Sequence, residues 1–279
     1  MLNSETIKKI EEFVYSKPRA IQEIAEHLGV SWRTADRFIE QMKKDFGTVD
    51  IRVFREGTRG ALKIVFWNSF EKASSSIFQE KLEQDILTEK RCENFSAFDI
   101  FQHVPNRSKK ASLELGQEER KTNLREYSSY LNLTEKQFLS FSGNLSFINL
   151  KNTNIDIFAE IEKLVKKKVS IKILCRVDLA SLENIKKVLE LNFKYGLEAI
   201  EIRHCEQPLR AMIIDNKVFR LKEIKEPTGK IHELNKKSFI FYTIKNREWA
   251  EWGSRIFWKL FSQSVRAEKR IEELKKLRQ

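Results

Sequence analysis

The chain has 279 residues, 41% of them hydrophobic, so it is long enough to form two domains with buried cores. Lys and Arg outnumber Asp and Glu by 52 to 40, and this net charge of +12 favours polyanionic partners, nucleic acid first and anionic membrane surfaces second. The sequence has no signal peptide and no apolar run of the roughly 18 to 20 residues that a membrane span needs, so we expect a cytoplasmic, nucleoid-associated protein without a membrane partner.

The first 68 residues contain the pattern of a helix-turn-helix. The segment "SETIKKIEEFVYS" predicts a first helix, because its apolar residues recur at helical spacing. In "AIQEIAEHLGVSWRTADRFIEQM", Gly29 suits a sharp turn after a short helix, and Ser31 suits the N-cap of the next one. The apolar residues after Ser31 repeat at intervals of three and four, which predicts an amphipathic helix.

The runs "VDIRVF" and "ALKIVFW", separated by "REGTRG", predict a basic β-hairpin directly after this helix. Residues 1–68 are therefore predicted to be a winged helix-turn-helix that binds double-stranded DNA, with helix side chains in the major groove and hairpin side chains on phosphates or in the minor groove. The candidate DNA-binding residues are Ser31, Trp32, Arg33, Thr34, Arg37, Arg55, Thr58 and Arg59. The alternatives are that the winged helix docks a protein, and that Trp32 packs in the core.

Residues 69–134 are predicted to be a helical connector or dimerisation arm. Phe78, Leu82 and Ile86 follow one another at intervals of four, which gives a narrow apolar stripe suited to one partner helix. The segment from Pro105 to Gly116 is expected to be a solvated loop that interrupts two helices. Together with an apolar stripe near the C-terminus (Ile271, Leu274 and Leu277), the connector predicts a homodimer.

Residues 135–279 alternate predicted strands with helices of about a dozen residues, which indicates βαβ units and a parallel or mixed sheet. The hairpin "RAMIID-NK-VFRLKEI" is expected to add edge strands, and one long helix is expected from about 247 to 277. The predicted fold class is thus α+β and α/β in two domains joined by the connector. The three cysteines form neither a CxxC pair nor a metal spacing, so we predict no metal and no cofactor.

This order of elements resembles the archaeal TrmB-like transcriptional regulators, in which a winged helix is fused to a degenerate phospholipase-D-like domain. The resemblance rests on "SFSGNLSFI" at the start of the second domain, on "LRAMIIDNKVFRL", and on the aromatic helix "REWAEWGSRIFWKLFSQ". It implies that residues 135–279 are one phospholipase-D-like half, an α/β sandwich with a long terminal helix, which serves dimerisation or the sensing of a small polar ligand. The connector departs from the cleaner coiled coil of the family.

The phospholipase-D-like resemblance also locates a former catalytic motif. Such enzymes carry His, then Lys two residues later and Asp five residues after that, and these offsets hold Pro208, Arg210 and Asp215 here. Proline can be neither the nucleophile nor the acid of phosphodiester cleavage, so we expect no catalytic residues and no enzyme activity. His204 is the one nearby histidine, and a structural role is expected for it.

Three functions therefore compete. The favoured one is a DNA-binding transcriptional regulator whose second domain dimerises or senses a ligand. The second is an abundant, chromatin-like structural DNA-binding protein with little sequence specificity. The third, a phosphodiesterase or nuclease, is disfavoured because no histidine of the chain is followed two residues later by lysine.

Overall fold

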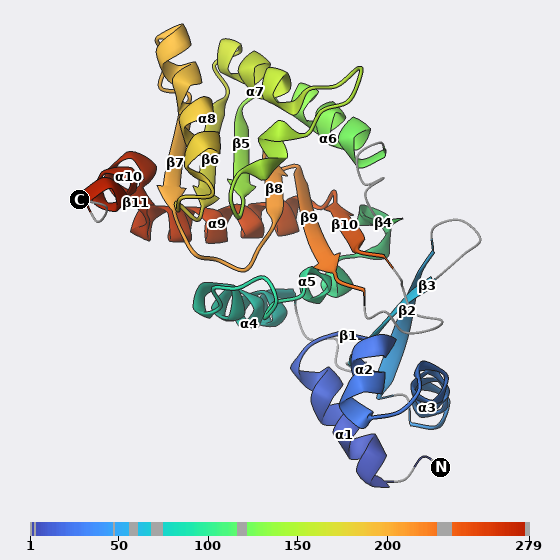
Figure 1. Ribbon diagram of the computed structural model, residues 1–279. Coiled ribbons are helices and arrows are strands. Elements are labelled where there is room, and N and C mark those ends of the chain that lie inside the picture. Colours follow the sequence, from blue (N-terminus) through green and yellow to red (C-terminus); the bar gives the residue numbers. More distant parts are fainter. Residues whose placement is uncertain are drawn as a thin grey trace.

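The computed structural model describes residues 2, 4–46, 48–55, 61–67, 75–115, 122–227 and 236–276 (Figure 1). These residues form a small N-terminal unit of helices with a three-stranded sheet, and a larger mixed α/β unit built on an eight-stranded sheet. Of the helices in this described part, none is both long and apolar enough to cross a membrane.

The N-terminal unit packs three helices against a small antiparallel sheet with the strand order β1-β3-β2. Gly29 ends α2 with a φ of 66°, a left-handed conformation that favours glycine, and the Ser31 side chain caps α3 by accepting a hydrogen bond from the Thr34 N–H. The buried core is formed mainly by apolar residues at helical spacing on α1, α2 and α3. In chain order the elements are α1 (Ser4–Ser16), β1 (Arg19–Ala20), α2 (Ile21–Leu28), α3 (Trp32–Asp45), β2 (Val49–Arg55) and β3 (Ala61–Trp67).

The large sheet has the strand order β11-β7-β6-β5-β8-β9-β10-β4, with β5, β6 and β7 parallel and every other neighbouring pair antiparallel. The parallel strands follow from the helical crossovers between them, as expected from the alternating sequence pattern. The strands are β4 (Lys109–Leu115), β5 (Gln137–Phe141), β6 (Ser170–Cys175), β7 (Ile200–His204), β8 (Ala211–Ile214), β9 (Val218–Lys225), β10 (Ser238–Ile244) and β11 (Val265–Arg266).

Helices cover both faces of this sheet and enclose two apolar cores (Figure 1). One face carries α6 (Thr122–Asn132), α7 (Ile157–Lys166), α8 (Leu182–Tyr195) and α10 (Ala267–Lys276). The other carries α4 (Ser75–Thr88), α5 (Ala97–His103) and α9 (Arg247–Gln263). Trp249 and Trp252 of α9 are each 1% exposed, so these aromatic residues pack the helix onto the sheet.

The predicted connector differs from the structure in two respects. The prediction of a solvated loop is wrong for Lys109–Leu115, because this segment is β4 and pairs along its whole length with β10. The alternation of Ala111, Leu113 and Leu115 toward the core is a period-two signal that the flanking proline and glycine concealed.

The apolar stripe of the connector is also used within the chain. Leu82 and Ile86 are buried in the core beneath α9, and Phe78 stacks on His103. At the other end of the chain, Ile271 is buried against the opposite core and Leu274 packs against it. These stripes are therefore not left exposed in a monomer, and the homodimer stays a prediction without that support. Leu277 lies outside the described residues.

Two expectations about the C-terminal part are also corrected. The hairpin of β8 and β9 lies inside the sheet, between β5 and β10, and does not form an edge. The expected single terminal helix is broken at Ser264, whose extended backbone lets Val265–Arg266 pair with Arg203 and His204 of β7. The chain then turns into α10, which covers the core of the parallel strands.

Candidate nucleic-acid interface and basic pocket

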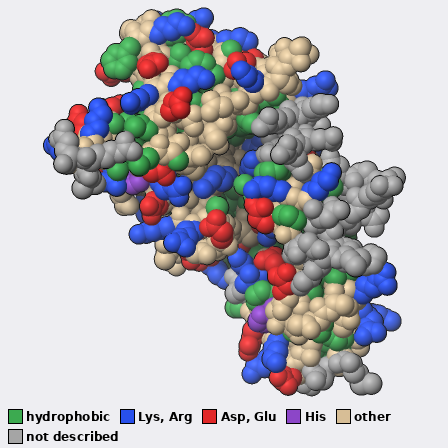
Figure 2. Space-filling view, in the orientation of Figure 1, with side chains coloured by type: hydrophobic (Ala, Val, Ile, Leu, Met, Phe, Trp, Pro, Cys, Tyr) green, Lys and Arg blue, Asp and Glu red, His purple; other side chains and the backbone are tan. Residues whose placement is uncertain are grey.

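The outer surface of α3 presents a stripe of basic and polar side chains. Arg33, Arg37, Gln41 and Lys44 are exposed and follow one another at intervals of four, four and three residues, so they share one helix face. Figure 1 draws α3 on the side of the N-terminal unit away from α4, and Figure 2 shows blue Lys and Arg side chains gathered over that edge. The face can therefore approach a large polyanion without obstruction from α4.

Two carboxylates of α3, Asp36 and Glu40, lie on a neighbouring row of the helix. The Lys63 ammonium on β3 lies 2.6 Å from an Asp36 oxygen and 3.4 Å from a Glu40 oxygen. This arrangement draws Asp36 and Glu40 toward the hairpin, while Asp45 at the end of α3 is exposed one turn after Gln41. The stripe itself has the electrostatic sign that phosphate contact requires.

The residues predicted to bind DNA fall into three groups. Ser31 and Thr34 are engaged in the helix cap, with their hydroxyl oxygens 2.9 Å apart, and Trp32 is half-buried and packs against the core. Arg33 and Arg37 lie on the exposed stripe. Arg55 ends β2, and Thr58 and Arg59 lie outside the described residues.

Sequence reasoning missed Gln41 and Lys44 as members of the α3 stripe. Their offsets of eight and eleven residues from Arg33 were the available signal, because these offsets return to the same side of a helix after two and three turns.

The N-terminal unit is packed against the larger unit through one face of its hairpin. Phe54 of β2 is buried in the core that α5 and β10 also line, with its ring centroid 6.4 Å from that of Phe98 and 6.2 Å from that of Tyr242. Beside this contact the Lys225 ammonium of β9 lies 3.5 Å from Glu23 of α2 and 3.1 Å from Glu223. The apolar contact and the ion pairs together fix how α3 is held relative to the large sheet.

Two of the positions predicted to hold the degenerate phospholipase-D-like motif have structural surroundings. Pro208 is buried before β8. Asp215 has a φ of 49° in the turn between β8 and β9, and its carboxylate accepts hydrogen bonds from the backbone N–H groups of residues 135, 136 and 137 at 2.8 to 2.9 Å. Asp215 therefore holds the start of β5 in place.

The histidines in the described part are also placed structurally. His204 Nδ1 accepts a hydrogen bond of 2.9 Å from the Val177 N–H, and burial lowers the pKa of this imidazole. His103 stacks on Phe78, and burial lowers its pKa to about 4. His27 stacks on the Phe13 ring, with 4.1 Å between the ring centroids. His232 lies outside the described residues.

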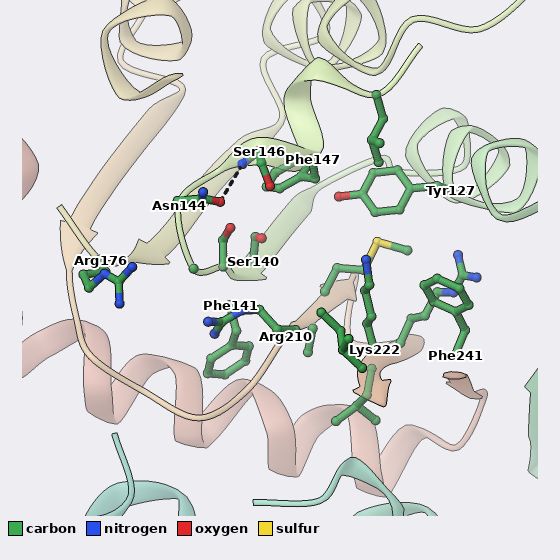
Figure 3. A pocket seen from close by; sticks show the side chains of 18 residues that line it. Tyr127, Ser140, Phe141, Asn144, Ser146, Phe147, Arg176, Arg210, Lys222 and Phe241 are labelled. Atoms are coloured by element: carbon green, nitrogen blue, oxygen red, sulfur yellow. Dashed lines mark hydrogen bonds between the residues drawn. The ribbon is translucent and has the colours of Figure 1, made fainter. Parts of the chain in front are cut away.

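Arg210 lines a cavity of about 340 Å³ beside the carboxyl end of β5. Figure 3 shows Arg176, Arg210 and Lys222 around one side of this cavity, and Tyr127 and Phe147 on the other. The guanidinium of Arg210 lies against the Gly143 backbone, where an added Cβ would come within 2.9 Å of Nη2. A side chain at position 143 would therefore displace Arg210, which makes this glycine a requirement for the position of the cation.

No protein-family model and no curated protein matches the sequence. Similar solved structures include Nuc, a phospholipase D family member from Salmonella typhimurium, at 13% identity and a TM-score of 0.39 over 56% of this chain and 98% of that one. They also include TrmBL2, described as an archaeal chromatin protein with a novel mode of DNA binding, at 15% identity and a TM-score of 0.38 over 95% of this chain and 94% of that one. Identities and TM-scores this low assign neither a family nor a function.

Proposed function

We propose that this protein is a transcriptional regulator that binds double-stranded DNA through α3. The observation that carries the proposal is the exposed stripe of Arg33, Arg37, Gln41 and Lys44 on the outer side of the N-terminal unit. A helix of this diameter enters the major groove of B-DNA, where arginine can bind guanine with two hydrogen bonds and glutamine can bind adenine in the same way.

In this proposal residues 4–67 are a winged helix-turn-helix. The short α2, the turn at Gly29, the capped α3 and the β2–β3 hairpin occur in the order that such domains have. Thr58 and Arg59, which lie outside the described residues, are proposed to contact the phosphate backbone next to the groove occupied by α3. The resemblance of the sequence to the TrmB-like regulators supports the same assignment.

The larger unit is proposed to be a phospholipase-D-like domain without phosphodiesterase activity. Cleavage through a covalent intermediate needs a nucleophile, and Pro208 at the expected histidine position supplies none. His204 is engaged with the Val177 backbone, and Asp215 with the backbone before β5, which supports structural roles for both. Cleavage of a bis-aryl phosphate that is lost in His204→Ala would refute this assignment.

A chromatin-like protein that coats DNA is the second candidate, because exposed arginine and lysine also bind phosphates without reading sequence. In that case the protein would be nucleoid-associated and abundant. A homodimer is compatible with either function, since two α3 helices related by a two-fold axis would occupy half-sites one or two helical turns apart.

The two candidate functions can be separated by fluorescence anisotropy. A fragment of the organism's promoter DNA and a scrambled duplex are each titrated with the protein over a salt series. A regulator is expected to prefer its site by about a thousandfold or more, because specific binders typically exceed their non-specific affinity by this factor. A chromatin-like protein would bind both duplexes alike, with the same steep salt dependence. Failure to bind either duplex at low salt would contradict DNA binding altogether.

A further inference from the structure

Strand pairing places several basic residues at the cavity beside β5. Arg210 is the residue opposite Lys222 on the neighbouring strand, since β8 and β9 pair with Ala211 opposite Leu221, and the Lys222 N–H donates to the Arg210 carbonyl at 2.7 Å. Arg220 precedes Lys222 by two residues, so its side chain projects to the same face of the sheet. Three cationic residues therefore occupy neighbouring positions on one face of the sheet, and all three line the cavity.

Arg220 adds a stronger requirement for an anion. Its side chain is 3% exposed, and its Nη2 donates to a Glu126 oxygen of α6 at 3.1 Å. Its Nε and Nη1 are also buried and find no acceptor among the described residues. The rings of Phe241 and Tyr130 flank the guanidinium, with their centroids 4.8 and 5.8 Å from Cζ, but a ring face offers no oxygen acceptor. A buried cation with two unused donors is costly unless a ligand accepts from them.

The walls of the cavity indicate the size and character of this ligand. Its described lining contains Arg176, Arg210, Arg220 and Lys222 and neither Asp nor Glu, so the lining is basic. Two of these cations have a carboxylate partner just outside the lining: Asp178 for Arg176 and Glu126 for Arg220. A volume of about 340 Å³ exceeds what a bare ion fills and lies in the range of small-molecule sites. The remaining walls combine hydroxyl and amide groups with aromatic rings: Ser140, Ser142, Asn144, Ser146, Tyr127 and Phe147.

We propose that this cavity binds a phosphorylated small molecule. Its phosphoryl group lies among Arg210, Arg220 and Lys222, and its organic part contacts the hydroxyl and aromatic wall that Figure 3 shows opposite the cations. A phosphomonoester carries close to two negative charges and several acceptor oxygens at neutral pH, which matches a cluster of cations better than a single carboxylate does. The proposal does not depend on how the N-terminal unit contacts DNA.

Inorganic phosphate is the probe for the phosphoryl site, measured by calorimetry and thermal shift against sodium chloride of equal ionic strength. Phosphate is expected to bind the wild-type protein and raise its Tm. Arg210→Met should weaken phosphate binding at least about tenfold, since it removes a charge-assisted contact. The Tm of the same variant without phosphate reports separately on the loss of the hydrogen bond from Arg210 Nη1 to the Leu209 carbonyl. Lys222→Met serves as a second variant, since loss of Arg220 would also remove one of the two cations that pair with Glu126.

Arg247→Met is the matched control, because Arg247 is an exposed arginine of α9 on the opposite side of the sheet. It should bind phosphate like the wild type. The proposal is overturned if phosphate gives no more stabilisation than sodium chloride, or if Arg210→Met and Lys222→Met bind it as the wild type does. It is also overturned if a short DNA duplex displaces phosphate and both pocket variants weaken DNA binding by the same factor, because the cavity would then be part of a nucleic-acid surface.

Discussion

The α3 stripe and the cavity beside β5 are both basic, but their cations are held differently. Arg33 and Arg37 are exposed to solvent, whereas Arg220 is buried and keeps unused donors inside the protein. An exposed arginine remains hydrated until a polyanion displaces counterions, so its contribution depends steeply on salt. A buried arginine has already lost its hydration, so it favours a small anion that fits its geometry and is screened less. The same residue type thus suits a DNA surface in one region and a small-molecule site in the other.

The two regions are joined through β9 and the shared core. Arg220 and Lys222 line the cavity, while Lys225 of the same strand pairs with Glu23 of the N-terminal unit and with Glu223. We call this contact between the N-terminal unit and the larger unit the joint. Its stability decides whether the two units unfold together or separately.

Phe54→Ala is expected to have the largest effect on this joint. Truncating a buried phenylalanine costs about 3 to 5 kcal/mol, and here it also removes the ring that contacts Phe98 and Tyr242 across the joint. We expect urea unfolding, followed by tryptophan fluorescence, to change from one transition to two. Phe38→Ala is the matched control, because Phe38 is buried only in the core of the N-terminal unit. A single unfolding transition for Phe54→Ala with a loss below about 1 kcal/mol would show that the joint is unimportant.

Asp215→Ala tests whether Asp215 has a structural role. Its carboxylate accepts three backbone hydrogen bonds, and it stands at a positive φ that alanine adopts poorly. The free energy of unfolding should fall by about 1 to 3 kcal/mol. Asp215→Asn, which tolerates that φ and keeps an oxygen acceptor, should lose less. If the wild type, Asp215→Ala and Asp215→Asn were equally stable in urea, Asp215 would not have this structural role.

Some elements of the fold could be predicted from the sequence, and others could not. The alternating strands and helices, the turn at Gly29 and the cap at Ser31 follow from local periodicity and backbone chemistry, and they occur as expected. The β4 strand was hidden because strand pairing with β10 comes from a partner more than 120 residues away.

The cavity was only partly predictable. Arg210 was identified from the motif offsets, but Arg220 was not, because "VFRLKEI" was interpreted as an edge strand where a charged residue needs no partner. Only the interior position of β9 makes Arg220 buried. Its position between Phe219 and Leu221 was a signal, since a cation that alternates with core residues projects into the opposite layer.

The joint should also respond to pH through Asp99 of α5. Burial, and then the charges of Glu223 and Asp85, raise the pKa of this carboxyl to about 8, while Lys81 and Lys17 oppose the shift. An unfolded aspartate has a pKa near 3.9, so between about pH 4 and pH 8 the folded protein keeps a proton that the unfolded chain has lost. The stability from this group therefore falls as the pH rises through that window.

Asp99→Asn removes that proton linkage and isolates it from the other titrating groups. The drop in Tm between pH 5 and pH 8 should be smaller in the variant than in the wild type by about 2 to 4 °C or more. The same drop in both proteins would contradict a raised pKa for Asp99.

Lys44→Ala is expected to have the smallest effect and sharpens the description of the DNA surface. Lys44 ends the exposed stripe of α3 and suits a phosphate contact. Its loss should weaken binding of all duplexes alike and reduce the slope of log affinity against log salt by about 1. A change in sequence preference without a change in slope would instead place Lys44 on a base edge.

The central claim is that α3 carries the DNA contacts, and a pair of double variants tests it most directly. Arg33→Ala with Arg37→Ala removes two exposed arginines from α3, and Arg247→Ala with Arg255→Ala removes two exposed arginines from α9, so both variants lose the same charge. Anisotropy titrations at one fixed salt concentration should show the α3 variant weakened by about 1 to 3 kcal/mol for each lost base contact, and the α9 variant close to the wild type. Equal weakening in both variants, or none in the α3 variant, would contradict the account.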